Sequence, residues 1–192
     1  MTRLTPILPF SGPILFDESA VCDICRYARD GYQTKFKRET FGFLFGTLTS
    51  RHRLRVRRAV YYRGGRKTRT GVVFKDMATV MRGVRRRRQL ALARRLRVLG
   101  SFHSHVEIGG TVFRGLSQDD RESFVRDPEG AIEAIVFVWP GSNKILPSQA
   151  GTIVAYDPRC RLNFRLRVYA KRRNGIRMVC ARVVPSDIVI VF

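Results

Sequence analysis

The chain has 192 residues, of which 44% are hydrophobic, and it carries a formal net charge of +22. This length and composition suit a single folded domain spanning residues 1–192 and exclude a disordered or collagen-like chain. No run reaches the about 18 apolar residues of a membrane-spanning helix. The apolar N-terminus is broken by prolines, unlike a signal peptide. We therefore expect a cytoplasmic protein without a membrane span.

The positive charge is spread along the chain as well as clustered. Such a charge attracts polyanions, which include nucleic acids, anionic membranes and acidic proteins. A high arginine usage can equally reflect genome composition or a hot, salty cytoplasm. The charge alone does not decide between these readings.

The first predicted elements are a short strand at residues 13–16 and a helix that begins at Asp17 and ends near Gly31. Asp17 suits the N-cap position, and Glu18 in the first turn suits the helix dipole. The apolar face of this helix has the spacing i, i+3, i+4, i+7 and consists of Val21, Ile24, Cys25 and Ala28.

Four cysteines in a chain of this length do not indicate a disulfide framework. Cys22 and Cys25 lie one turn apart on the predicted helix, and we interpret them as small core residues. A second zinc site is the alternative. It would require the helix to meet both remaining cysteines, Cys160 and Cys180.

Residues 39–46 predict a strand that begins beside Glu39 and contains Gly42 and Gly46. Glycine inside a strand often marks the close approach of another backbone. Glu39 taken by itself would be read as part of a surface ion pair. Further strands are predicted at residues 53–62 and 71–74.

A long helix is predicted at residues 76–96, and its polar face is rich in arginine. This face is either simply solvated or a docking surface for RNA or an acidic protein. The arginines concerned are Arg82, Arg85, Arg86, Arg87 and Arg88.

A buried strand at residues 98–102 runs into His103, Ser104 and His105. In an extended segment residues i and i+2 point to the same face, so His103 and His105 can converge on one ion while Ser104 points away. Downstream, Ser117 suits the N-cap of a short helix that carries Asp120 in its first turn. Strands are then predicted at residues 131–139, 151–156 and 163–169, followed by a β-rich tail.

Together these residues resemble the JAMM, or MPN-plus, metalloprotease family over about residues 14–140. That family has an E-x-x-G-x-L-x-G segment, then G-x-x-H-S-H, then S-x-x-D. The matching positions are Glu39, Gly42, Leu44, Gly46, Gly100, His103, Ser104, His105, Ser117 and Asp120.

The resemblance implies a zinc ion held by His103, His105 and Asp120. It implies that Glu39 is the general base and that Ser117 stabilises the oxyanion. The implied fold is a cytidine-deaminase-like α/β domain, in which helices flank a curved mixed sheet. These residue types suit the chemistry, because zinc takes imidazole and carboxylate ligands and a free carboxylate can move protons.

The sequence departs from the family pattern between His105 and Ser117. Val106 and Leu116 stand where the family usually has proline, and the intervening loop is longer than usual. We expect this loop to alter the wall of the substrate groove, for which Val106 and Phe113 are the candidate residues.

The function implied is hydrolysis after the C-terminal Gly-Gly of a ubiquitin-like modifier, or of a sulfur-carrier protein of the same shape. A RadC-like nucleic-acid-associated protein and a non-catalytic MPN scaffold are the alternatives. A homodimer or a larger complex is left open.

Overall fold

The computed structural model describes residues 10–49, 52–68, 70–73, 83, 96–113, 115–141, 151–184 and 190–191. The helices in these residues are α1 (Glu18–Tyr32) and α3 (Gln118–Phe124). The strands are β1 (Ile14–Asp17), β2 (Phe41–Leu48), β3 (Leu54–Tyr61), β4 (Arg66–Lys67), β5 (Val72–Val73), β6 (Arg97–Val106), β7 (Ile132–Pro140), β8 (Ile153–Asp157), β9 (Leu162–Arg172), β10 (Gly175–Val179), β11 (Ala181–Val184) and β12 (Ile190–Val191).

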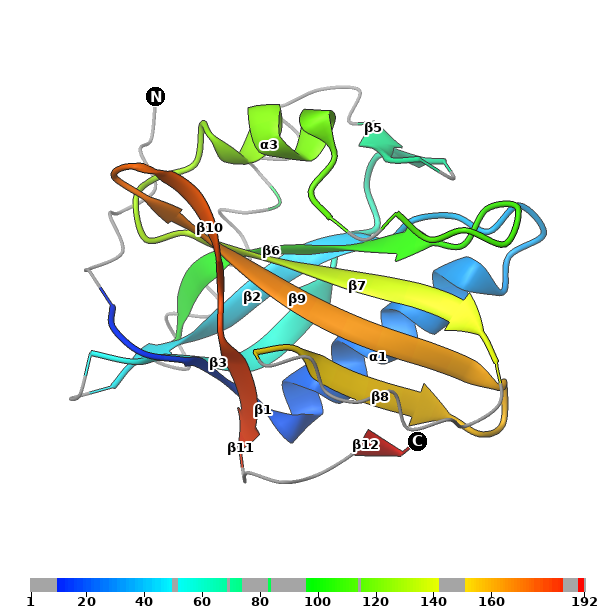
Figure 1. The fold of residues 1–192 in the computed structure, drawn as a ribbon, viewed down its shortest axis with the longest axis horizontal. Coiled ribbons are helices and arrows are strands. Elements are labelled where there is room, and N and C mark those ends of the chain that lie inside the picture. The colour runs from blue at the N-terminus through cyan, green and yellow to red at the C-terminus, as the bar shows by residue number, and fades with distance from the viewer. Residues whose placement is uncertain are drawn as a thin grey trace.

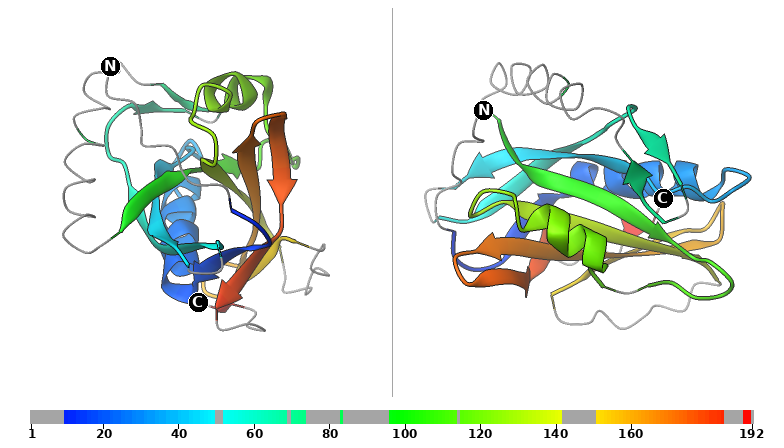
Figure 2. Two further views of the ribbon diagram at one scale, coloured as in Figure 1. Left: turned by 90° about the vertical axis from the view of Figure 1, so that its left-hand side faces the viewer. Right: turned by 90° about the horizontal axis from the view of Figure 1, so that it is seen from above.

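One ten-stranded sheet dominates the described part of the chain, with the order β11-β1-β3-β2-β6-β7-β9-β8-β12 and β10 paired to β9. The sheet curls around α1 until it resembles a nearly closed barrel (Figures 1 and 2). A separate two-stranded sheet is formed by β4 and β5. Neither described helix is long and apolar enough to cross a bilayer.

The expected cytidine-deaminase-like α/β fold, with helices flanking the sheet, is wrong. The described residues are mostly strand, and α1 and α3 are the helices among them. The reason lies in the C-terminal part, where β9 pairs with β7, β8 and β10. These pairings extend the sheet where a layered fold would place helices.

The predicted arginine-rich helix is not tested by this structure. Its five named arginines, Arg82, Arg85, Arg86, Arg87 and Arg88, lie outside the described residues. A role for them in partner binding therefore stays a prediction.

The central strands present alternate residues to two different layers. In β6 and β7, Phe102 pairs with Ala134, and both belong to the core cluster that includes α1 residues such as Ile24. The next pair, His103 and Ile135, faces the other way, where Phe124 of α3 packs. The period of two thus places α1 and α3 on opposite faces of β6 and β7.

The predicted close approach at the glycines of β2 is confirmed. A Cβ atom on Gly42 would lie 2.3 Å from the Phe102 ring, and one on Gly46 would lie 1.9 Å from the Arg55 carbonyl oxygen. Neither position has room for a side chain. The two glycines let β2 press against both of its neighbours, β3 and β6.

A Gly46→Ala variant should therefore be destabilised, because the added methyl group meets backbone that cannot move aside. We expect a loss of about 1–3 kcal/mol of unfolding free energy, typical of an overpacked site. Urea denaturation measures it. The control is Gly71→Ala, where a Cβ atom meets nothing within 4 Å. Equal stability of the two variants would contradict this packing.

Candidate metal centre

His103 and His105 lie near the end of β6 and project from the same face of the sheet. Their Nε2 atoms are 3.0 Å apart, and the side chains are nearly buried, with 6% and 7% of each residue exposed. This convergence follows from the alternation of an extended strand. Ser104, between them, points to the opposite face and is fully buried.

Asp120 completes the cluster from the first turn of α3. Its Oδ1 lies 3.3 Å from His103 Nε2, and its Oδ2 lies 3.3 Å from His105 Nε2. Ligand atoms of these three residues all lie within 4.8 Å of one another. Among the described residues, these three form the group of histidine, cysteine, aspartate or glutamate side chains that could hold a metal ion. Two imidazoles and a carboxylate are a donor set that zinc accepts, with a fourth position open.

The start of α3 fixes where Asp120 lies. Ser117 is the N-cap residue, and its Oγ accepts the Asp120 N–H at 3.1 Å. In return Asp120 Oδ2 accepts the Ser117 N–H at 2.8 Å. This capping box satisfies two backbone donors at the helix start. The same carboxylate therefore caps the helix and faces the histidines.

The outer nitrogen of each histidine has its own partner. His103 Nδ1 lies 2.9 Å from Glu133 Oε1 on β7, and His105 Nδ1 lies 3.2 Å from the Phe113 carbonyl oxygen. Both partners are acceptors, so each Nδ1 is the nitrogen that donates. In the neutral imidazole each Nε2 would then have a lone pair for an ion, as in carboxylate–histidine–metal arrangements.

Sequence reasoning missed Glu133. It is 7% exposed and stands inside a strand that is otherwise apolar, Ile132–Pro140. A single carboxylate in such a strand is unusual, because a buried charge needs a partner. That feature was the available signal.

The cluster is strongly coupled electrostatically. Burial acts to lower the pKa of His103, but hydrogen bonds to Asp120 and Glu133 outweigh it and raise that pKa to about 10. Burial acts to raise the pKa of Asp120, but its bonds to His103 and His105 hold that pKa well below the ordinary value. A metal ion would take the place of the histidine proton, because ligands bind in their deprotonated forms.

Glu39 lies just before β2, whose first residue Phe41 is paired with His103. Because side chains two residues apart in an extended segment share a face, Glu39 lies on the same face as Phe41 and the histidines. Its backbone N–H donates to the Thr68 carbonyl at 2.8 Å, and the residue is 7% exposed. Burial raises the pKa of Glu39 to about 8, while His103 lowers it and Asp120 raises it further. The charges of His103 and Asp120 therefore both act on the Glu39 carboxylate.

No family model matches the chain, and no curated protein matches it. Among solved structures, the chain is similar to the solution structure of protein DSY2949 from Desulfitobacterium hafniense. The TM-score is 0.56 and the sequence identity 15%, over 88% of this chain and 92% of that chain. At so low an identity the likeness shows a shared fold and carries no activity with it.

The two candidate groove residues have different surroundings. Val106 is 4% exposed and is paired with Val138 between β6 and β7, so its side chain belongs to the packed sheet. Phe113 is 58% exposed, and its ring centroid lies 5.9 Å from that of His105. Phe113 is therefore the one that a substrate could touch beside the metal centre.

The loop after His105 is anchored by Glu107, a residue that sequence reasoning also missed. Its carboxylate accepts hydrogen bonds from Lys37 Nζ at 2.5 Å, from Tyr32 Oη at 3.1 Å and from the Gly110 N–H. Ile108 and Thr111 close the turn as an antiparallel bridge. These contacts join the loop to the end of α1.

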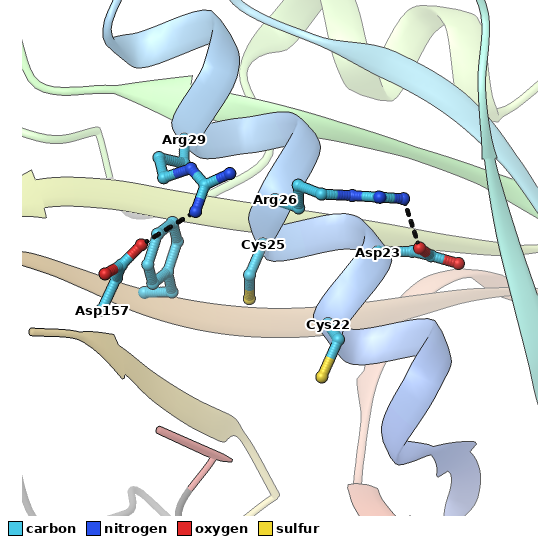
Figure 3. Close-up of a pocket in the computed structure, with 7 residues that line it drawn as sticks. Cys22, Asp23, Cys25, Arg26, Arg29 and Asp157 are labelled. Atoms are coloured by element: carbon cyan, nitrogen blue, oxygen red, sulfur yellow. Dashed lines mark hydrogen bonds and ion pairs between the residues drawn. The ribbon is translucent and has the colours of Figure 1, made fainter. Parts of the chain in front are cut away.

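The cysteines do not form a second ligand group in the described structure. Cys22 and Cys25 point from α1 into a pocket of about 210 Å³ (Figure 3). Burial raises the pKa of both thiols, and Asp157, which also lines the pocket, is paired with Arg29. All four cysteines are free.

Glu133→Gln should weaken zinc binding about 10- to 100-fold, the usual effect of losing the carboxylate behind a metal-binding histidine. Competition with a chromogenic chelator measures the affinity. The matched control is Glu129→Gln, an exposed position on the preceding turn that should bind zinc normally. Unchanged affinity in Glu133→Gln would show that the His103 contact does not orient the ligand.

Asp127 provides a test by pH. Burial and the nearby Glu133 raise its pKa to about 6, opposed by Lys171. In the unfolded chain the Asp127 carboxyl has a pKa of about 3.9. The free-energy cost of ionising Asp127 in the folded protein therefore develops as the pH rises past that value and is complete above about pH 6. Asp127→Asn should gain about 1–2 kcal/mol of unfolding free energy at pH 8 and much less, about 0.5 kcal/mol or under, at pH 4.

Denaturant titrations of wild type and Asp127→Asn at the two pH values give this difference. Glu129→Gln, exposed and two residues away, should show no pH-dependent gain. A gain that is the same at pH 4 and pH 8 would mean that ionisation of Asp127 is not its cause.

Proposed function

We propose that the protein is a zinc-dependent peptidase or isopeptidase that cleaves after the C-terminal Gly-Gly of a ubiquitin-like modifier or sulfur-carrier protein. The observation that carries the proposal is the convergence of His103, His105 and Asp120, with Glu39 on the same face. The resemblance of these residues to the JAMM motif supports the choice of reaction.

Zinc, when bound, would supply an acidified water, whose pKa falls to about 7 in such sites. Glu39 would accept a proton from the attacking water and return it to the leaving amine. A carboxylate whose pKa is raised to about 8 by burial suits both halves of that task near neutral pH.

Ser117 would have two roles. Its oxygen accepts the Asp120 N–H, which places the carboxylate ligand. A serine hydroxyl that accepts one bond can still donate its own hydrogen. That hydrogen could go to the oxygen on which negative charge develops during cleavage, and such a donor is worth about 10²–10³ in rate.

The proposed substrate class comes from the resemblance, and the charge of the chain and the exposed ring of Phe113 are compatible with it. A net charge of +22 favours an acidic partner and fast, salt-sensitive association. An extended Gly-Gly tail has no side chains to clash beside the partly closed centre. A cytoplasmic location and a homodimer or larger complex belong to this proposal as predictions.

Glu39→Gln should retain zinc and lose activity. Removing the proton carrier typically lowers the rate about 10²- to 10⁴-fold without changing the metal ligands. The assay is cleavage of a Gly-Gly-linked ubiquitin-like fusion by the zinc-loaded protein, with and without chelator. Glu122→Gln, an exposed change on α3, should behave as wild type.

The opposite result in the same assay would contradict the proposal. The zinc-loaded wild type would cut none of the ubiquitin-like fusions or conjugates offered, and Glu39→Gln would be indistinguishable from it. Salt-sensitive binding of nucleic acid by such an inactive protein would favour the RadC-like alternative.

A further inference from the structure

Ser104, the middle residue of the H-x-H step, makes an unusual contact on the face away from the histidines. Its Oγ accepts the Thr40 N–H at 2.8 Å and the Thr40 hydroxyl at 3.0 Å. Ser104 is 0% exposed and Thr40 is 3% exposed. A buried N–H that lost this acceptor would have no water to replace it, at a cost of about 1–3 kcal/mol.

The contact replaces a regular bond of the sheet. In an antiparallel ladder a hydrogen-bonded pair exchanges two backbone bonds. The Ser104 N–H does donate to the Thr40 carbonyl, at 3.0 Å, but the return bond goes from Thr40 N–H to the Ser104 side chain. The regular pairing of β2 with β6 accordingly begins at Phe41, opposite His103. The serine hydroxyl thus holds the chain at the point where it leaves the sheet.

Three consecutive backbone N–H groups fix the position of Glu39. Arg38 donates to the Gly31 carbonyl at 3.0 Å, and Glu39 donates to the Thr68 carbonyl at 2.8 Å. Thr40 donates to Ser104. The acceptors come from α1, from the β4–β5 connection and from β6. Ser104 supplies a side-chain acceptor, which a substitution can remove.

The other side of Thr40 is closed by α1. A Cβ atom built on Gly31 would lie 2.5 Å from Thr40 Cγ2, so the methyl group already rests against the helix end. Thr40 therefore has a packed helix on one side and the Ser104 hydroxyl on the other. Removing the hydroxyl takes away the acceptor of the Thr40 N–H and leaves the bond from the Ser104 N–H to the Thr40 carbonyl, so this peptide is held less firmly against β6.

We propose that Ser104 is a positioning residue, whose hydroxyl holds the Glu39–Thr40 peptide so that Glu39 stays on the face of β6 that carries His103 and His105. This inference rests on the proposed function, in which Glu39 moves the proton. Three consecutive residues of one strand then serve the site from opposite faces. The histidines bind the metal, and the serine aligns the base.

Ser104→Ala should lower kcat on the Gly-Gly-linked fusion about 10- to 100-fold, the effect of a catalytic group displaced by about 1 Å. KM and zinc affinity should not change. Ser104→Thr, which keeps the hydroxyl, should restore kcat to within a few fold. Ser123→Ala, an exposed serine on α3, is the control. If Ser104→Ala does not fold, Ser104→Cys, whose thiol is a weak acceptor, takes its place.

The decisive comparison is made in the Glu39→Gln background. If Ser104 acts through Glu39, Ser104→Ala should cost no further activity there. An equal loss in both backgrounds, a parallel loss of zinc affinity, or no loss at all would overturn the proposal.

Amide hydrogen exchange gives a readout that does not depend on activity. Ser104→Ala should speed exchange at Thr40 while leaving Phe102 protected. Should the wild type cut no substrate, the proposed function fails. Unchanged exchange at Thr40 would then overturn the positioning role, and faster exchange confined to residues 39–40 would support it.

Discussion

The candidate metal centre depends on the alternation of side chains along β6. Because the period of a strand is two, Phe102 and Ser104 face α1 while His103 and His105 face α3. A slip of one residue would exchange the two sets and put the imidazoles into the apolar core. The register is held by close packing, since the Phe102 ring fills the place of a side chain on Gly42. Packing on one face thus determines chemistry on the other.

The cluster also shows how a strongly basic protein can gather carboxylates at a candidate cation site. Glu39, Asp120 and Glu133 gather around two imidazoles where little solvent reaches. Mutual repulsion and burial make three carboxylates unfavourable together unless positive charge lies between them. The capping box at α3 holds Asp120 in place, and such caps contribute about 0.5–2 kcal/mol. Local helix chemistry therefore helps to hold a long-range arrangement.

Sequence patterns anticipated most elements but not the architecture. The amphipathic spacing of α1, the N-cap at Ser117 and the alternation at His103 are local, and each appears in the structure. The fold class came from the resemblance, and it failed where strand pairing is long-range. Nothing local in residues 151–191 says that β9 will join three other strands. Glu107 escaped notice for the same reason, because Lys37 is 70 residues away along the chain, whereas Glu133 did leave a local signal as a single carboxylate in an apolar strand.

The loop after His105 contacts both the candidate metal centre and the end of α1. Glu107 bonds to Tyr32 and Lys37, and these contacts hold the loop in place beside the site. Phe113 contacts this histidine with both its backbone and its side chain. Its carbonyl accepts a hydrogen bond from His105 Nδ1, and its ring is exposed beside the imidazole. A molecule that pressed on the ring would also push on the carbonyl group that orients His105. In a tightly packed site small displacements of this kind change side-chain geometry, so this loop is placed to affect both the candidate metal centre and whatever binds beside it.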